Sequence, residues 1–376
     1  MSPVTRRTFT TLPLLAATAS LADIRAQGLT PKTKHLMLVT SDGVRWQDIF
    51  GGMDPILKDE KSAGMADAKE LREKLWKPTP EERRKALMPF FWGTLVPRGI
   101  ALGNVNKGSS VQVANRYRFS FPGYSEILTG RAQDDRVNSN DDIQNPTPTL
   151  LEFVRQKWNL SPEQVALFAS WETFQFIGEH TPGSIFINAG QRDPKMARLP
   201  ERMREITRMQ YDALTPWDSA RHDAFTFEMA FEYLKTVHPK LIYVAFDESD
   251  DWAHSHRYDR VLDTLGFLDR SLARLWNWVQ SSPEYRSNTT LVVTCDHGRG
   301  STVKDWNDHG EKIPGDEQIW VAFIGPDTPA AGEAANTPLV HQQDIAPTIL
   351  ELLGIDYREY SGVEGKPIGM AIPKGG

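Results

Sequence analysis

Three short apolar runs along the chain each lead into acidic residues. Leu36–Val39 is followed by Asp42, Leu241–Phe246 by Asp247 and Asp250, and Leu291–Cys295 by Asp296 and His297. Short continuous apolar runs are typical of strands that are buried on both faces. Parallel strands present their carboxyl ends at one edge of a sheet. The pattern therefore predicts that these polar side chains lie close together.

Helical patterns separate the apolar runs. Between Tyr258 and Gln280, apolar residues recur at steps of three and four, which predicts one long helix with a buried stripe. A second helical pattern runs from Gln343 and stops at Gly354. Buried strands that alternate with helices predict an α/β fold, with a mostly parallel central sheet and helices on both faces.

Residues 55–98 interrupt this alternation. The segment is charged, contains tryptophan, and is helix-prone over 69–76 and 80–92. We expect it to form a helical insertion over the sheet rather than a linker.

The first residues have the pattern of an export signal. Arg6 and Arg7 precede the apolar run Leu12–Ala22, and small residues suited to cleavage follow at Ala19, Ala22 and Ala26. This predicts a twin-arginine signal over 1–26 and a single domain over 27–376. A membrane anchor is the alternative, but the run is shorter than the roughly 20 residues that cross a bilayer. We therefore expect a periplasmic or secreted protein without a stable membrane span.

Charge and cysteine content argue against further classes of function. The formal net charge is −6 and the basic residues are scattered, so no nucleic-acid-binding surface is expected. The single cysteine, Cys295, excludes an internal disulfide. It ends an apolar run and is predicted to be buried rather than nucleophilic.

Acids and histidines occur at spacings that suit metal ions. Asp250 and His254 are four residues apart, which places both on one face of a helical turn, where they can meet one ion. Asp247 or His256 would be the ligands if this segment is not helical. A capped or solvated turn is the non-metal interpretation.

Two further imidazoles follow in sequence. His297 stands beside Asp296 at a predicted strand end, and Gly298 permits close backbone approach. His309, before Gly310, precedes the next apolar run, Trp320–Ile324. Without a metal, these would be polar turn residues.

Ser120 is the candidate nucleophile. Pro122 suits the first turn of a helix and Gly130 its end, so Ser120 is expected just before a helix N-terminus, where an anion is favoured. It has no Gly-x-Ser-x-Gly elbow and no adjacent histidine, and it can equally be a simple N-cap. A metal ion would have to replace the missing base.

Taken in order, these positions resemble the alkaline phosphatase superfamily, nearest its nucleotide pyrophosphatase/phosphodiesterase branch. The residues that carry the resemblance are Asp42, Ser120-Phe-Pro with Thr129-Gly130, Asp250-x-x-x-His254, Asp296-His297-Gly298 and His309-Gly310. It implies that Asp250, His254 and His309 hold one metal. It also implies that Asp42, Asp296, His297 and the Ser120 oxygen hold a second. In that family both metals are usually zinc.

The resemblance implies hydrolysis of a small phosphate mono- or diester through a phosphoseryl intermediate. The branch usually has threonine where Ser120 stands. Its substrate-binding asparagine has two candidate counterparts, Asn138 and Asn140, and Asn104 or Lys107 are further candidate phosphate contacts.

Other functions of the superfamily stay open. Sulfatases resemble Cys/Ser-x-Pro-x-Arg at the nucleophile, and the arginine is missing here. A phosphonate hydrolase, a phosphomutase and a non-catalytic binding protein are the remaining alternatives.

Overall fold

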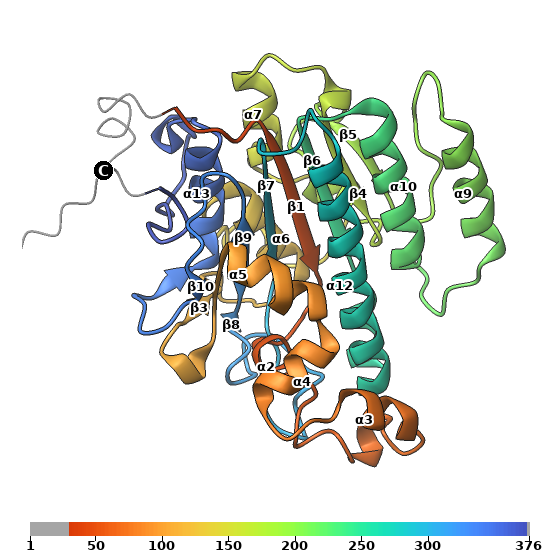
Figure 1. Ribbon diagram of the computed structural model, residues 1–376. Helices are drawn as coiled ribbons and strands as arrows, with labels where there is room; N and C mark the ends of the chain where they lie inside the picture. The colour runs from red at the N-terminus through yellow and green to blue at the C-terminus, as the bar shows by residue number, and fades with distance from the viewer. Residues whose placement is uncertain (1–29, 374–376) are drawn as a thin grey trace, which may run out of the picture.

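The computed structural model describes residues 30–373, whose centre is an eight-stranded sheet (Figure 1). The strands run in the order β10-β2-β9-β7-β1-β6-β4-β5. Their bounds are β1 His35–Ser41, β2 Ile100–Leu102, β4 Val165–Ala169, β5 Phe186–Ala189, β6 Leu241–Phe246, β7 Thr289–Thr294, β9 Val321–Ile324 and β10 Gly332–Glu333. A smaller sheet has the order β11-β3-β8. Its strands are β11 Val340–His341, β3 Val111–Gln112 and β8 Gln318–Ile319.

The mostly parallel sheet predicted from the apolar runs is confirmed. β1 lies at its centre and pairs in parallel with both β6 and β7. Only β9 runs against its neighbours, β7 and β2. Every residue of the three strands β1, β6 and β7 is buried, as expected for strands covered on both faces.

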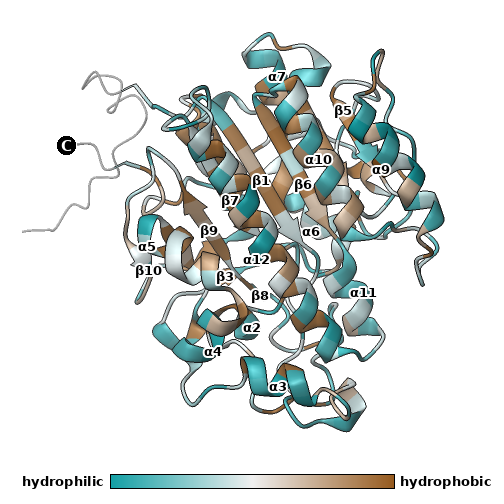
Figure 2. Cartoon of the chain, turned by 45° about the vertical axis from the view of Figure 1, so that its right-hand side comes forward, coloured by the Kyte–Doolittle hydropathy of each residue, from teal (hydrophilic) through white to brown (hydrophobic). Residues whose placement is uncertain are grey.

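Helices cover both faces of the sheet, with α10 and α12 in front and α6 behind in Figure 1. The helices are α2 Trp46–Gly51, α3 Lys69–Leu75, α4 Pro80–Leu87, α5 Val96–Arg98, α6 Ser120–Thr129, α7 Leu150–Lys157, α8 Phe174–Ile177, α9 Glu201–Asp212, α10 Asp223–Val237, α11 Glu248–His254, α12 Tyr258–Ser281 and α13 Ile345–Leu352. Figure 2 shows apolar strands between helices whose outer surfaces are polar. The long helix predicted from Tyr258 is α12, and its apolar stripe is buried.

The segment 55–98 forms α3, α4, α5 and a π-helical turn, Phe91–Leu95. The helix expected over 80–92 is interrupted, because Met88 leaves the helical conformation and ends α4 at Leu87. The segment is anchored to the body of the fold. Its Phe90 and Phe91 N–H groups donate to the carboxylate of Asp269 on α12, at 3.0 and 2.8 Å. In Figure 1, α3 and α4 lie beyond the carboxyl end of β1.

Within residues 30–373, no helix combines the length and the apolar character that crossing a membrane requires. Cys295 is fully buried, as predicted. The proposed signal over 1–26 lies outside the described residues.

Candidate metal centre

Asp42, Asp296 and His297 form a buried group at the carboxyl edge of the central strands. Asp42 follows β1, and the other two follow the neighbouring strand β7. The Nε2 atom of His297 lies 3.2 Å from Oδ1 of Asp42 and 3.4 Å from Oδ2 of Asp296. The adjacency of the two strands therefore brings together residues that are far apart in sequence.

In each side chain of this group, one polar atom is hydrogen-bonded to the protein and the other has no hydrogen-bond partner. Asp42 Oδ2 accepts from the Tyr124 hydroxyl at 2.9 Å, and Asp296 Oδ1 accepts from the Gly43 N–H at 3.0 Å. His297 Nδ1 donates to the Gly298 carbonyl at 2.9 Å. The three remaining atoms, Asp42 Oδ1, Asp296 Oδ2 and His297 Nε2, are buried without a hydrogen-bond partner.

These free atoms fit a divalent cation. Each buried polar atom without a hydrogen-bond partner lowers the free energy of unfolding by about 1–3 kcal/mol. A bound cation would satisfy all three atoms. Around a tetrahedral zinc ion with bonds of about 2.0–2.1 Å, ligand atoms lie about 3.4 Å apart. The observed separations of 3.2 and 3.4 Å agree with that spacing.

A second group is built on α11. Because this segment is helical, Asp250 and His254 lie on one face, with Asp250 Oδ2 3.2 Å from His254 Nε2. Asp247 is the N-cap of α11 and His256 lies past its end, so neither takes the place of these two residues. His254 Nε2 is also 3.0 Å from Nε2 of His309. His254 therefore lies close to both Asp250 and His309, although the three residues here whose ligand atoms all lie within 4.8 Å of one another are Asp250, His297 and His309.

Hydrogen bonding sets the tautomer of His309. Its Nδ1 lies 3.0 Å from the carbonyl oxygen of Arg118. A carbonyl only accepts, so Nδ1 carries the proton and Nε2 keeps its lone pair for a metal.

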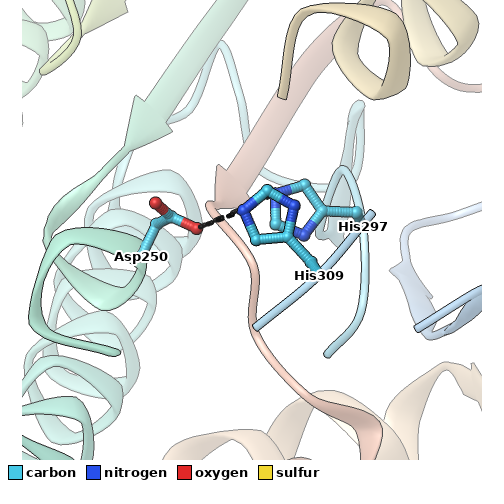
Figure 3. A group of neighbouring side chains, drawn as sticks. All are labelled: Asp250, His297 and His309. Carbon is cyan, nitrogen blue, oxygen red and sulfur yellow. Dashed lines mark ion pairs between the residues drawn. The ribbon is translucent and has the colours of Figure 1, made fainter. Parts of the chain in front are cut away.

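His297, a member of the first group, also lies against residues of the second. The rings of His297 and His309 stack at 3.9 Å, and Nε2 of each lies 3.8 Å from Oδ1 of Asp250 (Figure 3). The first group is fully buried, whereas the His254 side chain is 45% exposed. The second group therefore faces solvent.

Without a cation the buried group is electrostatically strained. Burial and the neighbouring Asp42 raise the pKa of Asp296 to about 8. Burial lowers the pKa of His297, but the attraction of Asp296 and Asp42 outweighs it and raises that pKa to about 9. Burial, with His297 and Arg299 nearby, holds the pKa of His309 far below its usual range. His309 is thus neutral, as a metal ligand must be.

Ser120 is the first residue of α6, with Phe119 as the N-cap. It lies one position further into the helix than expected, so it is not the cap itself. The first turn of α6 packs on the buried group. A Cβ atom on Gly123 would collide with the Asp296 carbonyl, and Tyr124 donates to Asp42.

The four candidate substrate residues occupy two different places. The Asn140 Oδ1 atom accepts from the Phe121 N–H at 2.9 Å, beside Ser120. Asn138 is exposed in the same segment. Asn104 and Lys107 instead both donate to the Glu333 carboxylate, each at 2.6 Å. They line a pocket of about 520 Å³ that none of the six potential metal ligands lines.

One residue of the centre was not anticipated from the sequence. The Arg299 guanidinium is buried and donates to the Asp250 carboxylate and to the Gly43 carbonyl. Its position, directly after Asp296-His297-Gly298, is the sequence signal that could have indicated it.

A family model matches most of the chain. The family model described as Sulfatase matches residues 121–355, more than half of the 376-residue chain. This stretch includes Asp250, His254, Asp296, His297 and His309.

Among proteins of known function, a 2,3-bisphosphoglycerate-independent phosphoglycerate mutase of Synechococcus elongatus is 28% identical over 121 residues. The match covers 31% of this chain, which spans only about a fifth (21%) of the mutase.

Solved structures share the fold. Wild-type alkaline phosphatase PafA superposes with a TM-score of 0.57 at 12% identity, covering 92% of this chain and 100% of PafA. Phosphonate monoester hydrolase SpPMH from Silicibacter pomeroyi gives a TM-score of 0.55 at 11% identity, covering 89% of this chain and 76% of SpPMH. The predicted nearness to the pyrophosphatase branch has no support among these matches.

Proposed function

This chain belongs to the sulfatase family, on a fold shared with members of the alkaline phosphatase superfamily, and we propose that it hydrolyses small phosphate mono- or diesters with Ser120 as nucleophile. The observation that carries the proposal is a pair of ligand groups that share His297, namely Asp42, Asp296 and His297 and then Asp250, His297 and His309, packed against the first turn of α6.

We assign two divalent ions, zinc in both places, to these groups. Asp42, Asp296 and His297 would hold one ion together with the Ser120 oxygen. Asp250, His254 and His309 would hold the other. Imidazole and carboxylate ligands at tetrahedral spacing favour zinc. When bound, such ions lower the pKa of the serine hydroxyl and neutralise charge on the leaving oxygen.

The residues of the chain supply the remaining functions. Ser120 Oγ attacks phosphorus, forming the Ser120 O–P bond as the ester P–O bond breaks, and the alcohol leaves with a proton. Water then hydrolyses the phosphoserine. Because Ser120 lies in the first turn of α6, a phosphoryl group on its oxygen would lie at the positive end of the helix, where negative charge is stabilised.

Asn140 is the better placed of the two asparagines for binding the phosphate. Its Oδ1 atom accepts from the Phe121 N–H, which turns the Nδ2 donor to other partners beside Ser120. Asn104 and Lys107 are bound to Glu333, which supports a structural role for both.

Sulfate esters are the second candidate, favoured by the family model. Against this, Tyr124 stands where the Cys/Ser-x-Pro-x-Arg motif of sulfatases has arginine, and its hydroxyl is bound to Asp42. The absence of this arginine favours phosphate over sulfate. From the sequence signal over 1–26, we also propose export to the periplasm or beyond.

The test is a substrate panel on protein with measured zinc content. Aryl phosphate monoesters and diesters should be hydrolysed, and the matching sulfate and phosphonate esters should be much poorer substrates. Protein that holds about two zinc ions and hydrolyses only sulfate esters would establish the second candidate instead.

A further inference from the structure

We propose that Arg299 is a positioning residue that holds the ligands of both metal sites in register. The inference rests on the proposed two-metal function and assigns this buried guanidinium a role in it. Arg299 itself need not touch the ions or the substrate.

Arg299 contacts three segments that carry proposed ligands and itself belongs to a fourth. Its Nε atom donates to the Gly43 carbonyl at 3.0 Å, directly after Asp42. Its Nη1 atom donates to the carbonyl of Asn307, two residues before His309. Its Nη2 atom donates to Asp250 Oδ1 on α11. Arg299 is itself two residues after His297, so one side chain connects four segments.

Burial makes these contacts obligatory. Arg299 is 2% exposed, so water cannot replace an acceptor that moves away. A guanidinium presents its donors in a rigid planar fork, whereas an ammonium group is a single point with rotatable donors. Only arginine can therefore satisfy three separate acceptors at fixed directions.

The backbone of the loop after β1 is shaped to admit this side chain. Gly43 has φ +59°, a conformation that favours glycine. A Cβ atom at this position would lie 2.7 Å from Arg299 Nη2 and 2.9 Å from Asp250 Oδ1. The close approach of the three groups therefore requires glycine, independently of the contacts above.

Arg299 also fixes how Asp250 is presented. Its hydrogen bond occupies Oδ1 and leaves Oδ2 directed at His254, 3.2 Å away. Oδ2 of Asp250 is thus available to the proposed metal site that includes His254. Groups that orient metal ligands from behind typically contribute 10- to 100-fold in metal affinity.

The experiment compares zinc affinity in Arg299→Met, Arg299→Lys and wild type, measured by competition with a chromophoric chelator. We expect both ions to bind about 10- to 100-fold more weakly in Arg299→Met. Arg299→Lys should restore only part of the loss, because it keeps the charge without the fork. Gly43→Ala should weaken zinc binding although Arg299 is intact.

Arg45→Met is the matched control. Arg45 is equally buried and forms ion pairs with Asp48 and Asp54, but it contacts none of the proposed ligands. It should lower the melting temperature while leaving zinc affinity in the folded protein within about twofold. Circular dichroism checks the fold of each variant, and Arg299→Lys carries the comparison if Arg299→Met does not fold.

Unchanged or tighter zinc binding in both Arg299 variants would overturn the inference, since Arg299 would then compete with the metal for Asp250. Wild-type protein without zinc affinity would overturn both the inference and the metal centre. Zinc-loaded wild type that hydrolyses no ester would refute the proposed reaction alone. In that case the loss of zinc affinity in the variants would still support the positioning role.

Discussion

At the scale of single residues, the proposed centre separates groups that would hold a metal from the group that would react. Ser120, the proposed nucleophile, lies on a helix whose backbone hydrogen bonds do not depend on its hydroxyl. The proposed ligands Asp42, Asp296 and His297 instead each have a buried atom without a hydrogen-bond partner. Substitutions in the two classes should therefore have different consequences.

Ser120→Ala should leave the fold and zinc content largely intact, because Asp42, Asp296 and His297 remain to hold the ion that the Ser120 oxygen would share, and should lower kcat/KM at least about a thousandfold. Ester hydrolysis and zinc content are measured on the same preparation. Ser281→Ala, at the exposed end of α12, is the control. Full activity in Ser120→Ala would transfer the nucleophile to another residue.

His309→Ala should lower zinc content by about one ion per chain, because it removes one imidazole from the exposed site. Loss of activity should follow the loss of zinc in titrations with added metal. His256→Asn is the matched control, since His256 has φ +55°, which asparagine tolerates. If His256→Asn lost the ion and His309→Ala kept it, the ligand assignment would be wrong.

At the scale of elements, the sequence predicted the long helices and central strands well. The stripe from Tyr258 is a real helix face because it packs along the sheet, and its residues are buried. The break at Met88 was not predicted. Local propensity favoured a continuous helix there, but the contacts of Phe90 and Phe91 with Asp269 come from a distant helix.

Gly123 tests how closely α6 must approach the strand ends. Gly123→Ala should lower the free energy of unfolding by about 1–3 kcal/mol, because its Cβ collides with the Asp296 carbonyl. It should also weaken zinc binding in the buried group. Denaturant unfolding and zinc titration provide the two readouts. Gly93→Ala, with nothing within 4 Å of its Cβ, should be neutral or slightly stabilising.

At the scale of the whole molecule, the proposed metal centre predicts that the stability of the fold depends on metal content. Three carboxylates, Asp42, Asp250 and Asp296, converge on one edge of the sheet, and the buried Arg299 contacts one of them, Asp250. Chelation should therefore destabilise the protein as a whole, and the effect should depend on pH.

The direction of that dependence follows from two shifted groups. In the metal-free fold the pKa of Asp296 is raised to about 8, so its deprotonation costs stability as pH rises from about 4 to 8. The pKa of His297 is raised to about 9, so its stabilising proton is lost between about pH 6.5 and 9. Both effects therefore lower the free energy of unfolding as pH rises.

The melting temperature of chelated protein should accordingly fall between pH 6 and 9, whereas that of zinc-loaded protein should change little. Zinc binds the deprotonated ligands and removes the penalty. Thermal unfolding with a chelator and with excess zinc measures both curves. Parallel curves would show that these groups do not hold metal.

The sequence by itself determined the types of group at the centre and the strands that deliver them. Apolar runs that end in Asp42, Asp250 and Asp296-His297 are local patterns, and local patterns are readable because burial and helical periodicity act over a few residues. The order of these motifs also identified the superfamily.

Only the tertiary structure decided how those groups are combined. Arg299 contacts segments that are far apart in sequence, and Asn140 accepts from the first turn of α6 beside Ser120. Asn104 and Lys107 likewise pair with the distant Glu333. Such contacts leave no periodic trace in the sequence, because each is set by the packing of whole elements rather than by neighbouring residues.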